Sequence, residues 1–202
     1  MPGRAPGLLS AAWIIARKDL AVELRNRSAF LSVLVFTLLA LATFFFAWDP
    51  TAVAAIDLAP GVLWVTFTFA GLLGLHRSFG MELHERAIDA LLAAPIERES
   101  IYLGKALANA VVVGTVLMVA LPALALFYNL PPVATIVALA PVAALAAVGL
   151  VCVGTLFSSM AVNTRMAELL LPMLSLPFFV PIVLASAQAS TRLLAGRPFA
   201  EA

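Results

Sequence analysis

Ten ionisable side chains gather in one stretch of an otherwise apolar sequence, residues 76–100, which read HRSFGMELHERAIDALLAAPIERES. His76 and His84 are the only histidines of the chain, and imidazole nitrogens can bind a metal or a haem iron. The single cysteine, Cys152, lies far from both along the chain. We interpret both histidines as ordinary polar residues of a surface segment, with iron binding as the less favoured alternative. No catalytic, cofactor-binding or metal-binding residue is predicted.

The same stretch contains an amphipathic pattern over about residues 82–92, which Pro95 ends. At about 100° per residue, apolar and polar side chains separate onto two faces of a helix. The polar face holds Glu82, Glu85, Arg86 and Asp89. Three carboxylates and one arginine are a poor match for anionic lipid headgroups, which attract basic helices. We therefore predict that this face binds a basic surface on another protein, with a helix that only lies among the headgroups as the alternative.

Motifs for nucleotide binding and hydrolysis are absent from the sequence. No GxxxxGK[ST] occurs, because Ala106 follows Gly104-Lys105 and Glu99 stands where the first glycine should be. The signatures HExxH, GxSxG and CxxC are also missing. The chain is therefore not predicted to be an enzyme, and ATP hydrolysis would have to come from a separate subunit.

The elements that position these residues follow from composition. Of 202 residues, 63% are hydrophobic and 11% are charged, whereas a soluble domain has about 25% charged residues. Five apolar stretches are long enough to cross a bilayer, which takes about 20 helical residues. They lie at about residues 28–48, 58–75, 101–128, 133–157 and 169–189. The predicted fold is all-α, a polytopic transmembrane helical bundle that forms a single domain over residues 1–202.

Lysine and arginine predict how the bundle lies in the membrane. With the N-terminus in the cytoplasm, ten basic residues fall on the inner side and only Arg192 and Arg197 fall outside. Acidic and basic residues all lie at or beyond the ends of the predicted spans, which argues against an ion path through the bilayer. A net charge of +1 without a basic tract predicts no binding to nucleic acid.

A further amphipathic helix is predicted over residues 10–27. Trp13, Leu20 and Leu24 cluster within a narrow arc that Ala16 borders. The polar side chains of Lys18, Asp19, Glu23 and Arg25 point elsewhere. Tryptophan and basic side chains suit the headgroup level of a membrane. We predict an interfacial helix on the cytoplasmic surface, and contact with a partner protein is an equally good interpretation.

Several motifs occur in an order that is typical of one family. They are Ala59-Pro-Gly-Val-Leu-Trp64, His76-Arg77 before the acidic segment, Ala90-Leu-Leu-Ala-Ala-Pro-Ile96, Gly104-Lys-Ala106, Leu169-Leu-Leu-Pro172 and Thr191-Arg-Leu-Leu-Ala-Gly196. From about residue 10 to its end, the chain resembles the haem exporter protein B (CcmB) family. Members of that family are membrane subunits of the cytochrome c maturation ABC transporter.

The resemblance implies a permease that exports or handles haem for c-type cytochrome biogenesis in the bacterial cytoplasmic (inner) membrane. A separate cytoplasmic ATP-binding subunit like CcmA would drive it, and membrane proteins like CcmC and CcmD would be further partners. Haem is then a cargo rather than a bound cofactor. In related exporters an N-terminal surface helix and the loop after the second span contact the ATPase, which here are residues 10–27 and 79–100. Paired ATPase subunits would need two copies of this chain, and the family usually has six spans where this sequence contains five.

Two other functions remain open on the sequence alone. One is an ABC exporter subunit for another cargo, and the other is a membrane scaffold that assembles a maturation complex without transporting anything. An adjacent gene for a P-loop ATPase would favour transport, and neighbouring genes for cytochrome c assembly would favour haem. An intramembrane enzyme is the least favoured, since no catalytic cluster lies within the predicted spans.

Overall fold

A computed structural model of the whole chain describes residues 7–25, 27–84, 96–161 and 167–197, with side chains described except at 29, 76–84, 161 and 167–171. Six helices and no strands occur in these ranges. The helices are α1 (Leu8–Arg25), α2 (Arg27–Ala47), α3 (Ala55–His84), α5 (Arg98–Phe127), α6 (Pro132–Ala161) and α7 (Ala167–Leu194). The all-α prediction is therefore confirmed.

Five of these helices, α2, α3 and α5–α7, are long and apolar enough to cross a membrane. Their apolar segments are Phe30–Ala47, Ala55–Leu75, Arg98–Phe127, Pro132–Met160 and Pro172–Leu194. Each coincides with one of the stretches expected from the sequence, so the prediction of a polytopic bundle is confirmed. The third span, α5, begins at Arg98, a few residues before its predicted start at about 101. The fifth span, α7, continues to Leu194, beyond its predicted end at about 189.

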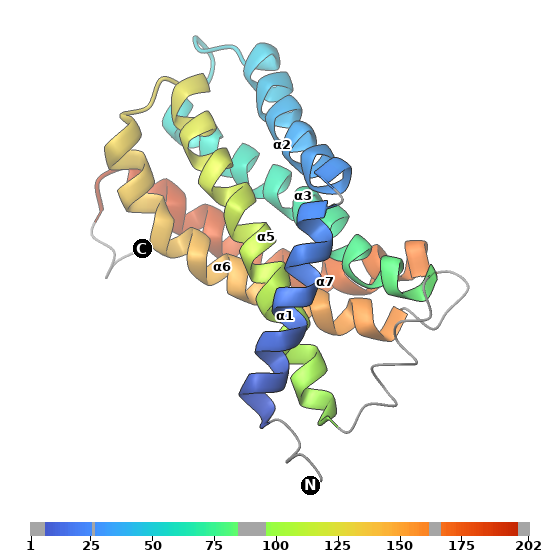
Figure 1. Cartoon of the computed structure of the whole chain (residues 1–202). Coiled ribbons are helices and arrows are strands. Elements are labelled where there is room, and N and C mark those ends of the chain that lie inside the picture. The colour runs from blue at the N-terminus through green and yellow to red at the C-terminus, as the bar shows by residue number, and fades with distance from the viewer. Residues whose placement is uncertain (1–6, 26, 85–95, 162–166, 198–202) are drawn as a thin grey trace, which may run out of the picture.

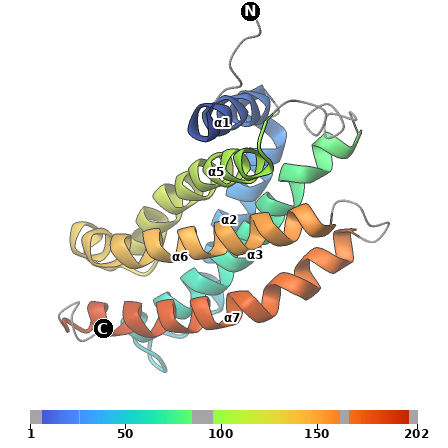
Figure 2. The same ribbon diagram turned by 90° about the horizontal axis from the view of Figure 1, so that it is seen from below.

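The central helix of the bundle is α3, which packs against α2, α5, α6 and α7 (Figure 1). Trp64 and Phe67 of α3 are buried, with their rings edge to face at 5.8 Å. The Trp64 Nε1–H donates a 3.0 Å hydrogen bond to Ser190 Oγ of α7, which satisfies the buried indole. In Figure 2, α6 and α7 run side by side along their whole length.

Small residues allow the helices of this bundle to approach closely, as is usual where lipid surrounds them. A β-carbon placed at Gly149 of α6 would lie 3.1 Å from Ile182 Cδ1 of α7. A β-carbon at Gly154 of α6 would collide with the Leu75 side chain of α3. Large apolar side chains such as Leu39, Met118 and Val137 remain exposed on the outside, where a bilayer would cover them.

Two ends of the bundle differ in what they contain. The turns that join α2 to α3 and α5 to α6 lie together with the end of α7 (Figure 1, upper left). The beginnings of α2, α5 and α7 and the ends of α3 and α6 lie toward the other side, where α1 packs against α5 and α2. We call these the turn end and the α1 end. The turn that joins α5 to α6 contains Asn129, which has a φ of 50°, a left-handed conformation that asparagine tolerates better than most residues.

The first helix, α1, does not belong to the bundle of spans. It runs crosswise to α6 and α7 in Figure 1 and is seen nearly end-on in Figure 2. Its main contact is with α5, and it passes through residue 26 into α2. The helix expected over residues 10–27 is therefore present at Leu8–Arg25.

Candidate functional site at the junction of α1 and α5

The predicted acidic docking face lies almost wholly outside the described residues. Glu82 belongs to the last turn of α3, which continues to His84, but its side chain is not described. Glu85, Arg86 and Asp89 lie outside the described ranges. The docking face thus stays a prediction, as does the alternative of iron binding by His76 or His84.

The residues predicted for the interfacial helix lie on α1 and are accessible. Trp13 is 64% exposed, and Leu24, Arg25 and Lys18 are also exposed, whereas Glu23 is half-buried. The face that packs against the protein is a different one, formed by Ala11, Ala12, Ile15 and Ala16. The sequence pattern therefore identified the outer apolar arc of α1 but not the face that contacts α5.

Small side chains on both helices produce the contact between α1 and α5. A β-carbon added at Gly104 of α5 would lie 2.7 Å from Ile15 Cβ and 2.8 Å from the Ala12 carbonyl oxygen. Real β-carbons essentially never approach other atoms this closely. Any side chain at position 104 would consequently push α1 away from α5.

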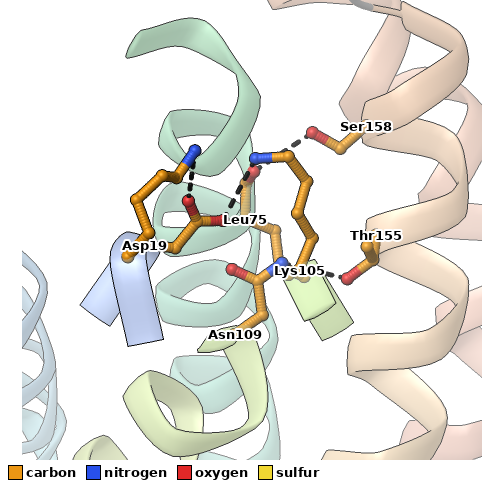
Figure 3. Close-up of polar contacts among 7 residues, drawn as sticks. Asp19, Leu75, Lys105, Asn109, Thr155 and Ser158 are labelled. Carbon is orange, nitrogen blue, oxygen red and sulfur yellow. Dashed lines mark hydrogen bonds and ion pairs between the residues drawn. The ribbon is translucent and has the colours of Figure 1, made fainter. Parts of the chain in front are cut away.

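Next to this contact, a lysine is buried between the helices. Lys105 has a side chain that is only 1% exposed, and its Nζ lies 3.2 Å from Oδ2 of Asp19 on α1 (Figure 3). The other oxygen of the carboxylate, Oδ1, lies 3.0 Å from Nζ of Lys18, whose side chain is 43% exposed. The Asp19 carboxylate therefore joins a buried ammonium to one that faces outward.

The polar contacts continue from Lys105 into the bundle. Asn109, one turn further along α5, donates through Nδ2 to Thr155 Oγ1 of α6 at 3.0 Å (Figure 3). Ser158 Oγ, also on α6, donates to the Leu75 carbonyl oxygen of α3 at 3.2 Å. These contacts join α1, α5, α6 and α3 through directional interactions at the α1 end.

One expectation from the sequence needs correction here. Ionisable residues were placed only at or beyond the ends of the spans, but Lys105 lies four residues inside the stretch predicted at about 101–128 and seven residues after Arg98, where the apolar segment of α5 begins. It is buried because Asp19, 86 positions earlier in the chain, supplies a carboxylate. No spacing rule on a single sequence connects two residues that far apart, so the site could not have been found that way.

Comparison with known proteins places the chain in a family. A family model described as CcmB protein matches residues 10–201, which include all five spans and α1 except for its first two residues. The chain belongs to the CcmB family. The heme exporter protein B of Rhodobacter capsulatus is 31% identical over 175 residues, covering 87% of this chain and 80% of the relative. The resemblance noted from the sequence motifs is thereby confirmed.

Two further relatives carry the same name. The heme exporter protein B of Paracoccus denitrificans is 31% identical, covering 89% of this chain and 82% of the relative. That of Bradyrhizobium diazoefficiens is 30% identical, covering 93% of this chain and 84% of the relative. In this CcmB-family chain, Ala11, Asp19, Gly104 and Lys105 at the junction of α1 and α5 fall within residues 10–201, which the family model matches.

Proposed function

We propose that this CcmB-family chain is the permease subunit of an ABC transporter that exports or handles haem for c-type cytochrome biogenesis. The observation that carries the proposal is the family match over residues 10–201 in a chain with five helices able to span a membrane. The relatives named heme exporter protein B support haem as the cargo. The sequence has no P-loop, so a separate ATP-binding subunit supplies the energy.

The ATP-binding subunit contacts residues 79–100 and α1 in this proposal, on the cytoplasmic side of the bacterial inner membrane. The distribution of basic residues supports a cytoplasmic N-terminus. The position of α1 beside the beginning of α5, which directly follows the acidic segment, supports a shared contact surface (Figure 1). The assembly contains two copies of the chain, an ATPase like CcmA, and membrane partners like CcmC and CcmD.

The exposed side of α1 suits the level of the lipid headgroups. Leu9, Trp13 and Leu24 form an exposed apolar arc, and Arg17 and Arg25 are exposed beside it. Apolar side chains next to cations are typical of helices that lie in the membrane interface. In Figure 1, α1 runs crosswise to α6 and α7 but at a smaller angle to α2 and α5, so its exposed side chains rather than its direction support a place at the membrane surface.

Energy enters this permease as a displacement of residues 79–100 when the ATPase binds ATP and closes. The segment connects α3 to α5, so both helices receive the displacement. The hydrogen bond from Asn109 to Thr155 then joins α5 to α6, and that from Ser158 to the Leu75 carbonyl joins α6 to α3. A displacement at the α1 end therefore reaches three spans at once and changes access to the interior of the bundle.

Charge reversal on the acidic face tests the contact with the ATPase. In the whole complex, Glu82→Lys, Glu85→Lys and Asp89→Lys together should release the ATPase during purification in detergent, while the membrane subunit keeps its thermal stability. The matched control is Asp49→Lys with Asp57→Lys, because both carboxylates are exposed at the turn end. Retention of the ATPase by the acidic-face variant would contradict the docking proposal.

A scaffold that transports nothing is distinguished by inactivating the ATPase without removing it. If the chain is a permease, changing the P-loop lysine of the ATPase subunit should abolish cytochrome c maturation although the complex still assembles. Normal maturation with the inactive ATPase would favour the scaffold.

A further inference from the structure

Lys105 forms an ion pair with a helix that is not part of the bundle of spans. A buried ionisable residue within an apolar helix is costly unless a partner compensates it, and such residues commonly mark functional sites. The compensating carboxylate of Asp19 comes from α1, and Asp19 itself is 15% exposed. The ammonium is therefore compensated by this carboxylate only while α1 lies on α5.

Close packing of small side chains holds α1 against α5 but does not pair charged groups across the two helices. The face toward α5 consists of three alanines and Ile15, and the larger side chains Leu9, Trp13 and Leu24 point away from it. Small side chains bury little area, and lipid would compete equally well for apolar surface. The ion pair adds a directional contact that favours one position of α1 along α5.

The pair also lies where a displacement would enter the membrane domain. Lys105 follows Arg98, the first residue of α5, by a distance of about 10 Å along the helix axis. On the other side of the pair, α1 ends at Arg25 and α2 begins at Arg27, so a single residue separates the two helices in the sequence. A motion of the first turns of α5 that carries α1 with it must therefore also move the beginning of α2.

We propose that Asp19 and Lys105 are a positioning pair that makes α1 and the first turns of α5 move as one unit, so that displacement by the ATPase reaches α2. This inference rests on the proposed function. Neither residue contacts cargo or nucleotide in this role, because both act through the helices they join. The pair provides a second route by which a displacement of α5 reaches another span, from α5 through α1 to α2. The first route is the direct hydrogen bond from Asn109 of α5 to Thr155 of α6.

The attachment of α1 to α5 is measured first, with a pair of spin labels. In the parent protein with Cys152→Ser, labels at Ile14 of α1 and Leu107 of α5, which are both exposed, report the distance between the helices by electron paramagnetic resonance. The test variant is Asp19→Asn with Lys105→Met, which removes both charges, because replacing both partners of a buried pair usually preserves folding. We expect the narrow distance distribution of the parent to broaden in this variant.

The transmission of the displacement from the ATPase to α2 is measured with a second pair of labels. They are placed at Leu39 of α2 and Leu145 of α6, in the complex with the ATPase. In the parent, ATP binding should shift this distance. In the double variant the shifted population should fall by roughly 2- to 30-fold, the range expected when a coupling contact is lost. Asp19→Glu keeps the carboxylate and should retain the shift, and Lys18→Met should do the same, since Lys18 is outward-facing and lies on α1 itself.

If Asp19 and Lys105 do not couple the two helices, both label distances should behave in the double variant as they do in the parent. If the double variant folds, keeps the narrow distance between Ile14 and Leu107 and keeps the full shift between Leu39 and Leu145, the positioning role is overturned. Should the double variant fail to fold, Lys105→Met alone is used under the same labels, with the same expectations, because Asp19 then keeps its contact with Lys18 and no buried ammonium is left without its carboxylate. Failure of the proposed function would be seen separately, as a parent protein that shows no response to ATP, and the Ile14 to Leu107 distances would still decide whether the pair holds α1.

Discussion

The two ends of the bundle differ in the contacts that hold α2 and α5 in place, although a hydrogen bond from Trp64 to Ser190 also joins α3 to α7 toward the turn end. At the turn end, Phe45 of α2 and Trp48 of the following turn pack on Phe127, the last residue of α5, and on Tyr128, with ring centroids 5.5 to 6.0 Å apart. At the α1 end, an ion pair and hydrogen bonds join α1, α5, α6 and α3. Aromatic packing needs no exact partner atom, whereas each polar contact depends on one donor and one acceptor.

This difference indicates which end can move in the transport cycle. At the turn end, packed aromatic rings hold α2 and α5 together through many weak contacts. Breaking one of these contacts does not free the two helices to pair with other groups. Polar contacts at the α1 end can break and form again with other partners or water, so this end can hold more than one arrangement. The end proposed to face the ATPase is also the end whose contacts can be exchanged.

Removing the centre of the aromatic cluster should have the largest effect. Tyr128 is 1% exposed, and its ring contacts Phe45 and Trp48. Tyr128→Ala should lower the free energy of unfolding by about 3 to 5 kcal/mol because it leaves a cavity between α2 and α5. The measurement is reversible unfolding in mixed micelles.

The matched control is Tyr128→Phe. The buried Tyr128 hydroxyl has no hydrogen-bond partner among the described residues, so its removal should be neutral or stabilising by about 1 kcal/mol. A loss as large as that of Tyr128→Ala would mean that the hydroxyl, and not the ring, holds the turn end.

At the α1 end, Gly104→Ala should have the next largest effect. The new methyl group would overlap Ile15 and the Ala12 carbonyl, so α1 must shift, at a cost of about 1 to 3 kcal/mol in the free energy of unfolding. Faster trypsin cleavage after Arg17, Lys18 and Arg25 would report the loosened helix.

Gly114→Ala on the same helix serves as the control, because nothing lies within 4 Å of its would-be β-carbon. Alanine in a helix interior should stabilise by about 0.5 to 1 kcal/mol relative to glycine. Equal behaviour of the two alanine variants would show that α1 does not lie against Gly104.

How much of this comparison could be predicted from the sequence differs between the two ends. The five spans follow from apolar length, because a bilayer requires about 20 residues per helix. The helix α1 was also predicted, but its periodicity marked the exposed arc around Trp13 and Leu24. In a membrane the large apolar side chains can face lipid while alanine and glycine make the helix contacts, so apolar periodicity does not identify the packed face.

The pairing of Asp19 with Lys105 was beyond the sequence for another reason. No sequence pattern near Asp19 or Lys105 indicates that the two residues form an ion pair. They are brought together only because α1 crosses α5. The same holds for Asn109 and Thr155, which are 46 positions apart. Directional contacts between distant residues are set by the tertiary arrangement, which a single sequence does not display.

The hydrogen bond between α5 and α6 should contribute less than the packing at Gly104. Asn109→Leu removes the donor and leaves the buried Thr155 hydroxyl without it, which should cost about 1 kcal/mol in the free energy of unfolding. Adding Thr155→Val should recover part of the loss, because no buried hydroxyl then remains. If the double variant were less stable than Asn109→Leu, the side-chain shapes rather than the hydrogen bond would matter at this point.

The smallest effect is expected from pH at the turn end. The Asp49 carboxylate accepts hydrogen bonds from the Thr51 hydroxyl at 2.6 Å and the Thr51 amide at 2.9 Å, and these bonds lower the pKa of Asp49 below its ordinary value. A lowered pKa means that the stabilising contribution is complete above the pKa of an unfolded aspartate, about 3.9, and is lost as the pH falls through the lower folded value. Acid titration of the Thr51 amide resonance should therefore show a midpoint below 3.9, and Asp49→Asn should abolish the titration. Because the side chain is exposed and the rings beside it do not titrate in this range, the turn end should stay packed throughout, and unpacking of Phe45 and Tyr128 in the same pH interval would contradict the view that aromatic contacts hold it.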